Sequence, residues 1–139
     1  KAYENNILLV ASAGNMGGTK KVDTVTYPAA YDEVIAVAAV DKNGERASYS
    51  STGKRIDISA PGDYVYTTVQ SGLYFLATGT SMAAPHVSGV AALVLECQPN
   101  LDVEELRKIL LKSKTPFGNP KLYGKGIIDV PKTIKFSKN

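Results

Sequence analysis

The residue with the clearest potential for chemistry is Ser81, which stands where an extended polar segment changes into a run rich in alanine, valine and leucine. That change predicts a helix from Ser81 to Glu96, with the serine hydroxyl near its N-terminus. Free backbone N–H groups and the positive end of the helix dipole stabilise negative charge there, as acyl transfer through an alkoxide or an oxyanion requires. The same local pattern also fits an ordinary N-cap at Thr80 or Ser81, and by itself it leaves both interpretations open.

Asn15 is a second candidate because of the strand that it follows. The apolar run Ile7–Ala11 predicts a β-strand that is buried on both faces. In parallel α/β sheets, ligand-binding loops follow the carboxyl ends of the strands. We therefore expect the segment Ser12–Asn15 at a ligand-binding edge of the sheet.

The order of strands and helices along the rest of the chain predicts an α/β protein with a mainly parallel sheet. The helix from Ser81 to Glu96 carries few polar residues and is expected to be buried nearly all round. The other predicted elements are strands at Val34–Val40 and Ile56–Ser59, an antiparallel pair at Tyr64–Val69 and Leu73–Thr78, an amphipathic helix that begins with a capping box at Asp102 and Glu105, and a short last helix from Asp129.

The composition limits the classes of protein and partner. The chain has 139 residues, 16 Lys and Arg against 13 Asp and Glu, a formal net charge of +3 and 44% hydrophobic residues. These values exclude a disordered chain, and no apolar run approaches the length of about 18 residues that a membrane span needs. Because the basic residues are spread along the chain, neither a nucleic acid nor an anionic membrane is expected as a partner.

Two other kinds of site find no support in the sequence. Gly14, Gly17 and Gly18 follow a predicted strand, but they lack the spacing and the following helix of a dinucleotide-binding fingerprint. Cys97 and His86 make no ligand set for zinc, and a single cysteine cannot form an intrachain disulfide. We expect Cys97 to be a small core residue, and we expect no organic cofactor.

The string from Gly79 to Gly89, GTSMAAPHVSG, resembles the nucleophile motif of the subtilisin-like serine proteases. Other landmarks of that family have counterparts in the same order, at residues 11–15, 27–29 with 34–37, 46–51, 59–62 and 123–129. The similarity covers essentially residues 7–134. It implies the subtilisin-like three-layer α/β fold with a mainly parallel sheet, in which residues 1–139 form the C-terminal portion of the catalytic domain.

The resemblance also implies a role for each of several residues. Ser81 corresponds to the nucleophile of a serine endopeptidase, and its backbone N–H together with the Asn15 amide corresponds to the oxyanion hole. The other residues that it implies to be substrate-binding are Ser12, Ala13 and Gly14 as one wall of the pocket, Thr26 near the pocket floor, and Thr80.

A weak cation site, for calcium or another cation, is implied in the same way. Its ligands would be the backbone carbonyls of Ala29, Tyr31 and Val34 and the carboxylate of Asp57. A carbonyl-rich site leaves no side-chain signature, so a plain hydrogen-bonded turn remains the alternative.

The sequence departs from the family in lacking the segments that carry the His and Asp of the catalytic triad. His86 lies five residues beyond Ser81 on the same predicted helix, about 140° round its axis, so it is expected to be structural. We therefore expect the missing N-terminal part of the protease to supply both groups. The alternative is a catalytically inactive fragment or pseudoprotease half that only binds peptide or its complementary chain, and the isolated 139-residue chain is expected to be inactive.

The expected partners follow from the same resemblance. They are polypeptide substrates, the N-terminal part of the same protease and a propeptide. Most members of the family are secreted, so an extracellular location is expected. The family also has cytoplasmic members, and a single cysteine is compatible with both locations.

Overall fold

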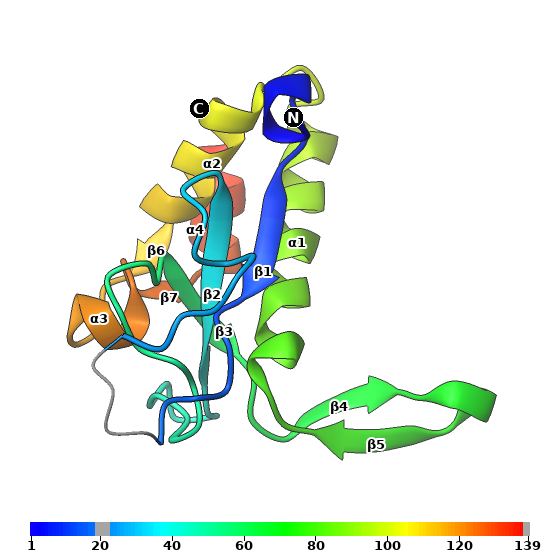
Figure 1. The fold of residues 1–139 in the computed structure, drawn as a ribbon. Helices are drawn as coiled ribbons and strands as arrows, with labels where there is room; N and C mark the ends of the chain where they lie inside the picture. The colour runs from blue at the N-terminus through cyan, green and yellow to red at the C-terminus, as the bar shows by residue number, and fades with distance from the viewer. Residues whose placement is uncertain (19–22, 138–139) are drawn as a thin grey trace.

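The computed structural model of the chain describes residues 1–18 and 23–137 and is an α/β protein built on one five-stranded sheet (Figure 1). The strands lie in the order β1-β2-β3-β7-β6, and all neighbours are parallel except β7 and β6. The mainly parallel sheet confirms the predicted class. The strands are β1 (Leu9–Ser12), β2 (Val34–Val40), β3 (Ile58–Pro61), β6 (Lys114–Thr115) and β7 (Ile127–Ile128).

Strand β2 is the centre of the sheet. Its sequence VIAVAAV is buried at every position, and its bounds are those predicted from the apolar run. Residue Val37 is paired with Ser12 of β1 on one side and with Ile58 of β3 on the other. Strand β1 departs from the prediction: its residues are only half-buried, because β1 lies at the edge of the described sheet and not between two strands.

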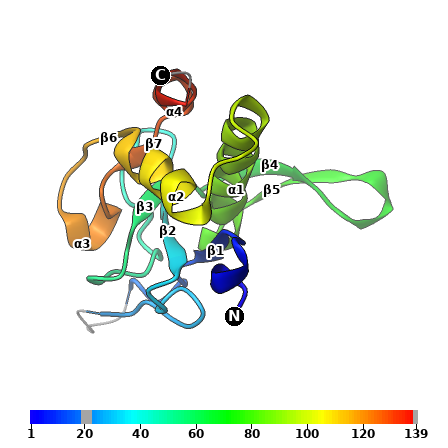
Figure 2. The same cartoon turned by 90° about the horizontal axis from the view of Figure 1, so that it is seen from above.

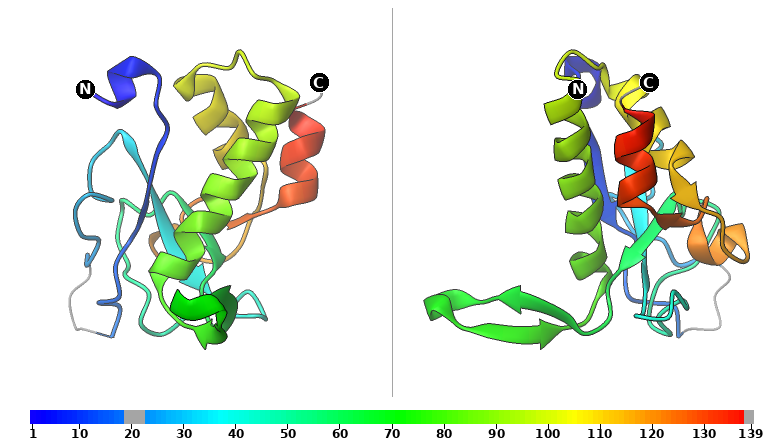
Figure 3. Two further views of the ribbon diagram at one scale, coloured as in Figure 1. Left: turned by 90° about the vertical axis from the view of Figure 1, so that its right-hand side faces the viewer. Right: turned by 180° about the vertical axis from the view of Figure 1, so that it is seen from behind.

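Helices α1 (Thr80–Cys97), α2 (Val103–Lys112) and α4 (Val130–Phe136) all lie on one face of the sheet (Figures 2 and 3). Helix α1 packs on β1, β2 and β3, while α2 and α4 pack against α1. On the opposite face, loop segments bury a small cluster of Ala13, Ala38 and Ile56 with Val25. The described residues form no second helical layer there, apart from the one-turn helix α3 (Pro120–Tyr123) at its border.

Helix α1 is buried on one side only, which corrects the prediction of a helix buried nearly all round. Ala83, Val87 and Val94 are completely buried against the sheet, whereas Leu93 is 44% exposed. Cys97, expected in the core, is exposed at the last turn. The physical reason is that a single sheet face and two flanking helices cover only part of the circumference of α1 in this chain. Among the described residues, no helix is long and apolar enough to cross a membrane.

A hairpin of β4 (Val65–Thr68) and β5 (Tyr74–Ala77) projects away from the body of the molecule, as Figures 1 and 3 show. The strands are antiparallel, as predicted, and the short 3-10 helix η2 (Gln70–Gly72) joins them. The rings of Tyr66 and Tyr74 stack with their centroids 5.3 Å apart on its surface. The returning strand leads through Thr78 and Gly79 directly into α1, so the hairpin sets the direction from which the chain enters the helix.

The short elements η1 (Tyr3–Asn5), α3, β6 and β7 were not predicted. A strand of two residues is too short to show a hydrophobic period, so it can be recognised only from its pairing with another segment of the same chain. Thr115 and Lys114 pair with β7, which in turn lies beside Ser59 of β3.

Helix α2 begins with the predicted capping box. The Asp102 carboxylate accepts a hydrogen bond from the Glu105 backbone N–H at 2.8 Å, and the Glu105 carboxylate accepts one from the Asp102 N–H at 3.1 Å. These bonds satisfy backbone donors that the helix itself leaves free. The buried face of the helix carries Leu106 and Leu110.

We expect Asp102→Ala to lower the free energy of unfolding by about 1 kcal/mol, because the Glu105 N–H loses its acceptor. Asp102→Asn is the matched control, since asparagine caps a helix as well as aspartate does. Urea unfolding followed by circular dichroism measures both. Equal losses of stability in the two variants would show that the cap does not stabilise this helix.

Candidate active site

The loop that follows β1 is ordered by hydrogen bonds along its backbone. The Ala13 N–H donates to the Val37 carbonyl at 2.9 Å, which extends the pairing with β2 by one residue. The Ala13 carbonyl accepts from the Thr26 N–H at 3.1 Å, and the Gly14 carbonyl accepts from the Ser51 N–H at 2.8 Å. Segment 12–14 is therefore a rigid backbone strip, with Ser12 as the last residue of β1 and the Ala13 side chain completely buried.

Thr26 lies directly against this strip. A Cβ atom added at Gly14 would lie 3.0 Å from the Thr26 Oγ1 and 3.0 Å from the Ser51 Oγ, and the φ angle of Gly14 is +108°. The position therefore requires glycine both for its backbone angle and for the close approach of Thr26. The structure thus brings together four of the predicted substrate-binding residues, which are Ser12, Ala13, Gly14 and Thr26.

The start of α1 lies over the carboxyl ends of β2 and β3. The Gly79 N–H donates to the Gly62 carbonyl at 2.8 Å. Gly62 is packed so closely that an added Cβ would meet the Ala39 Cβ at 2.6 Å and the Ala83 Cβ at 3.3 Å. Small residues at these positions let the first turn of the helix lie on the sheet edge, next to the loop that holds Asn15.

The Asn15 side chain is hydrogen-bonded to Thr80, the first residue of α1. The Asn15 Oδ1 accepts hydrogen bonds from the Thr80 N–H at 3.0 Å and from the Thr80 Oγ1 at 2.8 Å, while the Thr80 Oγ1 accepts one from the Gly14 N–H at 3.2 Å. The N-cap residue of α1 is Gly79, which has no side chain for capping, so the interpretation of Thr80 or Ser81 as the N-cap was wrong. Asn15, from a distant loop, supplies the acceptor that an N-cap side chain would otherwise provide.

This arrangement places two hydrogen-bond donors beside one space. With the Asn15 Oδ1 engaged by Thr80, its Nδ2 faces the other way. A Cβ atom added at Gly79 would lie 3.5 Å from that Nδ2 and 3.8 Å from the Ser81 backbone N. Both donors therefore border the space beside Gly79, at the positive end of α1 and next to the exposed Ser81. Such a pair of donors can stabilise an oxyanion that forms there.

His86 is not placed to serve Ser81. Its Nδ1 is 2.8 Å from the Met82 carbonyl, one turn back along the same helix, and its ring is exposed. Within residues 1–18 and 23–137, no hydrogen bond joins Ser81 to a histidine or to a carboxylate. The described part of the chain thus holds the Ser81 hydroxyl and two neighbouring hydrogen-bond donors, without a base beside them.

The surface of the described residues has a depression beside this site and larger ones elsewhere. The nearer one, of about 290 Å³, lies between β4 and the first turns of α1 and includes Val65 and Met82 in its lining. One of the larger ones, of about 580 Å³, lies around Asp57 and Phe117, and neither Ser81 nor Asn15 lines it. Because a reaction depends on the donors present and not on the volume of a depression, we take Asn15 and Ser81 as the candidate site.

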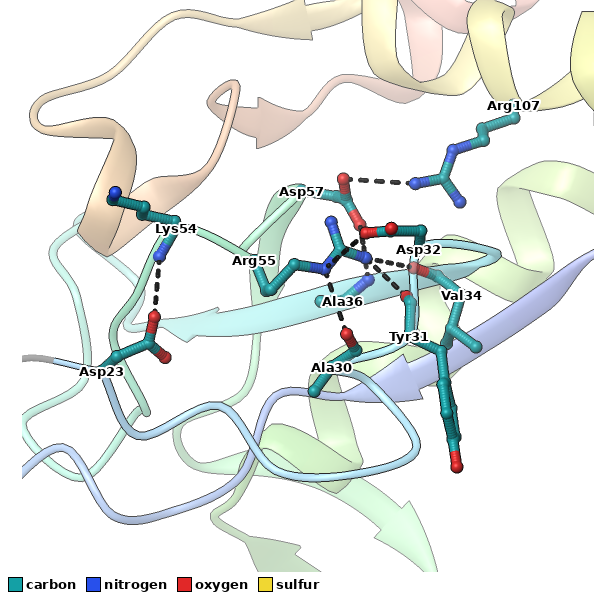
Figure 4. Close-up of polar contacts among 10 residues, drawn as sticks. All are labelled: Asp23, Ala30, Tyr31, Asp32, Val34, Ala36, Lys54, Arg55, Asp57 and Arg107. Carbon is teal, nitrogen blue, oxygen red and sulfur yellow. Dashed lines mark hydrogen bonds and ion pairs between the residues drawn. The ribbon is translucent and has the colours of Figure 1, made fainter.

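Three of the four residues predicted to ligate a cation do come together, around the guanidinium group of Arg55 (Figure 4). The Arg55 Nη2 lies 2.5 Å from the Tyr31 carbonyl, 3.4 Å from the Val34 carbonyl and 3.9 Å from the Asp57 carboxylate. Since this nitrogen stands among the same oxygens and already carries positive charge, the arrangement does not fit a metal ion. Ala29 takes no part in these contacts, and the neighbouring Ala30 carbonyl accepts from the Arg55 Nε at 3.3 Å. The described residues also contain no cluster of three or more His, Cys, Asp or Glu side chains able to hold a metal.

Sequence reasoning did not single out two residues that support the site. Tyr49 donates from its hydroxyl to the Gly62 carbonyl at 2.7 Å, the same oxygen that holds the Gly79 N–H. Arg55 holds the segment that follows Thr26 and leads into β2. Nothing in the local pattern marks either residue, because their partners lie 13 or more positions away along the chain.

Known proteins of one family resemble this chain over most of its length. The sequence profile of the subtilase family matches residues 1–126. Subtilisin DY of Bacillus licheniformis is 48% identical over 130 residues, and subtilisin E of Bacillus subtilis strain 168 is 44% identical over 130 residues. Each alignment covers 94% of this chain, but only 47% and 34% of the respective relative.

A solved structure agrees with the sequence matches. A protease from Pseudoalteromonas arctica PAMC 21717 superposes with a TM-score of 0.88 at 33% identity, covering 98% of this chain and 44% of that one. The chain therefore spans less than half the length of these relatives.

The pKa of Tyr49 tests whether its hydroxyl, which donates to the Gly62 carbonyl beside the start of α1, is shielded from water. Burial, and to a smaller extent the nearby Asp63 carboxylate, raise the pKa of Tyr49 from 10.0 to about 12. Because the pKa is higher in the folded than in the unfolded state, the stabilisation is complete below pH 10 and is lost as the pH rises from about 10 to about 12.

We expect the tyrosinate absorbance of wild-type protein minus that of Tyr49→Phe to show one group ionising near pH 12. The free energy of unfolding of the wild type should fall more steeply between these two pH values than that of the variant. A difference spectrum that titrates near pH 10 would show that the Tyr49 hydroxyl is open to water.

Proposed function

The chain belongs to the subtilase family, and from that premise we propose that it supplies the nucleophile and the oxyanion hole of a serine endopeptidase. Ser81 is the nucleophile, and the Ser81 N–H and the Asn15 Nδ2 are the oxyanion donors. The observation that carries the proposal is that these two donors border a single space beside Gly79, next to the exposed Ser81 hydroxyl. A serine at a helix N-terminus is also compatible with ordinary capping. In that case, however, the Asn15 amide from the distant loop would serve only to bind Thr80, and its Nδ2 would have no role.

The geometry supports a defined sequence of events at the peptide bond. The Ser81 Oγ attacks the carbonyl carbon, and the carbonyl oxygen gains negative charge as the carbon becomes tetrahedral. In this proposal that oxygen accepts hydrogen bonds from the Ser81 N–H and the Asn15 Nδ2, and the hydrogen bonds from Thr80 to the Asn15 Oδ1 limit the rearrangement that this needs. Asparagine suits this role, because it donates a hydrogen bond without adding a charge of its own.

Thr80 is a positioning residue in this proposal. Its N–H and hydroxyl both hold the Asn15 Oδ1, which fixes the amide so that its Nδ2 faces the space beside Gly79. Its hydroxyl in turn accepts from the Gly14 N–H, which ties the amide to the backbone strip of segment 12–14. The substrate-binding role expected for Thr80 is thus proposed to be indirect.

The proton that leaves Ser81 needs a base, and we propose that the His and Asp of a triad come from an N-terminal part of the same protease. The chain covers only 47% and 34% of the two subtilisins, which leaves room for such a part. A polypeptide substrate would lie along segment 12–14, with its side chain before the cut against Thr26. An extracellular location and a propeptide partner are proposed from the family alone.

An inactive fragment or pseudoprotease half is the second candidate. The observation that favours it is that Ser81 has no acid or base partner among the described residues. In that case the chain would bind a peptide or its complementary chain without cleaving either one. Labelling of the serine separates the two candidates, because only an activated hydroxyl reacts with a fluorophosphonate.

We expect a fluorophosphonate probe to add to Ser81 when the chain is present with the segment that carries the base, and not to add to the isolated 139 residues. Intact mass spectrometry under denaturing conditions, followed by peptide mapping, measures the adduct. Ser81→Ala should abolish it, while Ser88→Ala, which removes a hydroxyl two turns along the same helix, should leave it unchanged. Absence of an adduct from the complete protein would favour the inactive alternative.

Gly79→Ala and Gly89→Ala form a matched pair that tests the oxyanion hole. The methyl group at Gly79 would intrude between the two donors, and its φ of +157° disfavours alanine, so kcat should fall by at least about 10²-fold. The methyl group at Gly89 would meet nothing within 4 Å among the described residues and lies inside α1, so activity should be retained. Steady-state kinetics on a peptide substrate measure both, and circular dichroism checks the fold.

Asn15→Ala should lower kcat by about 10²- to 10³-fold with little change in KM, which is the magnitude measured for a corresponding asparagine in a subtilisin. A loss that appears only in KM would mean that Asn15 binds the substrate and not the transition state.

A further inference from the structure

Arg55 holds the loop between Thr26 and β2 through the oxygens of that loop. Its Nε donates to the Ala30 carbonyl at 3.3 Å, and its Nη2 donates to the Tyr31 carbonyl at 2.5 Å and to the Val34 carbonyl at 3.4 Å (Figure 4). A single side chain thus gathers three backbone carbonyls that point toward one centre. Backbone carbonyls converging in this way are the usual surroundings of a hard cation.

The carboxylates around this centre are balanced by guanidinium groups. Asp57, whose side chain is 12% exposed, lies 3.9 Å from the Arg55 Nη2 and 3.3 Å from the Arg107 Nη2. It also accepts a hydrogen bond from the Ala36 N–H at 2.9 Å. Asp32, on the surface, lies 3.5 Å from the Arg55 Nε. Two negative charges therefore face two positive charges, and a metal ion in the same place would lie next to both guanidinium groups.

We propose that the guanidinium group of Arg55 takes the place of a bound cation, so that the segment Ala30–Val34 keeps its shape without a metal ion. Arginine suits this role because its planar group stays charged at every pH at which proteins fold and presents several donors in a fixed fork. A spherical ion would bind the same oxygens with shorter contacts, but it would be lost by dilution or chelation. A covalently attached cation is always present.

The loop that Arg55 holds is connected to the candidate active site through the backbone. The Ala30 N–H donates to the Thr26 carbonyl at 3.1 Å, and the Thr26 side chain lies against Gly14. Arg55 thus acts on the proposed substrate pocket through the loop that begins at Thr26. The proposal concerns this loop and its stability, so it does not depend on whether Ser81 cleaves a peptide.

Removal of Arg55 should add a dependence on cations to whatever dependence the wild type has. In Arg55→Ala, the carbonyls of Tyr31 and Val34 and the Asp57 carboxylate remain, and the space of the guanidinium group becomes available to an ion and its waters. The measurement is the Tm of the complete protein in choline chloride, in KCl and in CaCl₂ at equal ionic strength. The quantity compared between the wild type and each variant is the rise in Tm when choline is replaced by potassium or calcium. Any other cation site contributes equally to this rise in all of these proteins, so the difference reports on the site of Arg55.

We expect that rise to be larger in Arg55→Ala than in the wild type, and to grow by about 3 to 6 °C for each tenfold increase in free cation once binding saturates. Lys54→Ala is the matched control: it removes one positive charge at the next position, where the lysine side chain is exposed and the backbone N–H donates to the Asp23 carboxylate at 3.4 Å. Its rise in Tm should equal that of the wild type. Equal rises in the wild type and in Arg55→Ala would overturn the proposal.

A crystallographic measurement decides the matter even if Arg55→Ala fails to fold. Thallium(I), a heavy substitute for potassium, is soaked into crystals of the wild type and located by its anomalous scattering. We expect no peak among the Tyr31 and Val34 carbonyls and Asp57 in the wild type, and one peak there in Arg55→Ala where that variant crystallises. A thallium peak at these oxygens in the wild type would show that a cation binds beside Arg55 and would overturn the proposal.

Discussion

The hydrogen bonds between Asn15 and Thr80 are the interaction on which the rest of the candidate site depends. The Asn15 Oδ1 accepts from both the backbone and the hydroxyl of Thr80, so a loop after β1 and the first turn of α1 become one unit although 65 positions separate the two residues. The bonds have two consequences. They satisfy a helix N–H that Gly79 cannot cap, and they leave the amide nitrogen as a directed donor next to Ser81.

That contact is possible only because the backbones approach one another closely beneath it. Gly62 leaves no space for a Cβ between Ala39 and Ala83, and its carbonyl receives hydrogen bonds from both Gly79 and Tyr49. The alanine-rich sequence of β2 has the same effect, since small side chains let α1 lie near the sheet. A larger residue at any of these points would lift the helix start and move the Ser81 N–H away from the Asn15 amide.

Arg55 illustrates how one arrangement of oxygens can be held in two chemically different ways. Converging carbonyls and a carboxylate attract positive charge, and either a bound ion or a guanidinium group can supply it. The first depends on the solution around the protein, whereas the second depends only on the sequence. The loop from Ala30 to Val34, and through it the position of Thr26, is therefore proposed to be independent of the supply of ions.

Local pattern was sufficient for features that depend on near neighbours in the chain. The strand Val34–Val40, the capping box at Asp102 and the helix after Ser81 all follow from hydrophobic period and from contacts over a few residues. The motif around Ser81 determined the family. Only the tertiary structure decided the half-exposure of β1, the exposed side of α1 and the position of Arg55 among the carbonyls. Burial and long-range hydrogen bonds depend on which distant segments meet, and that information is not present in any local stretch of sequence.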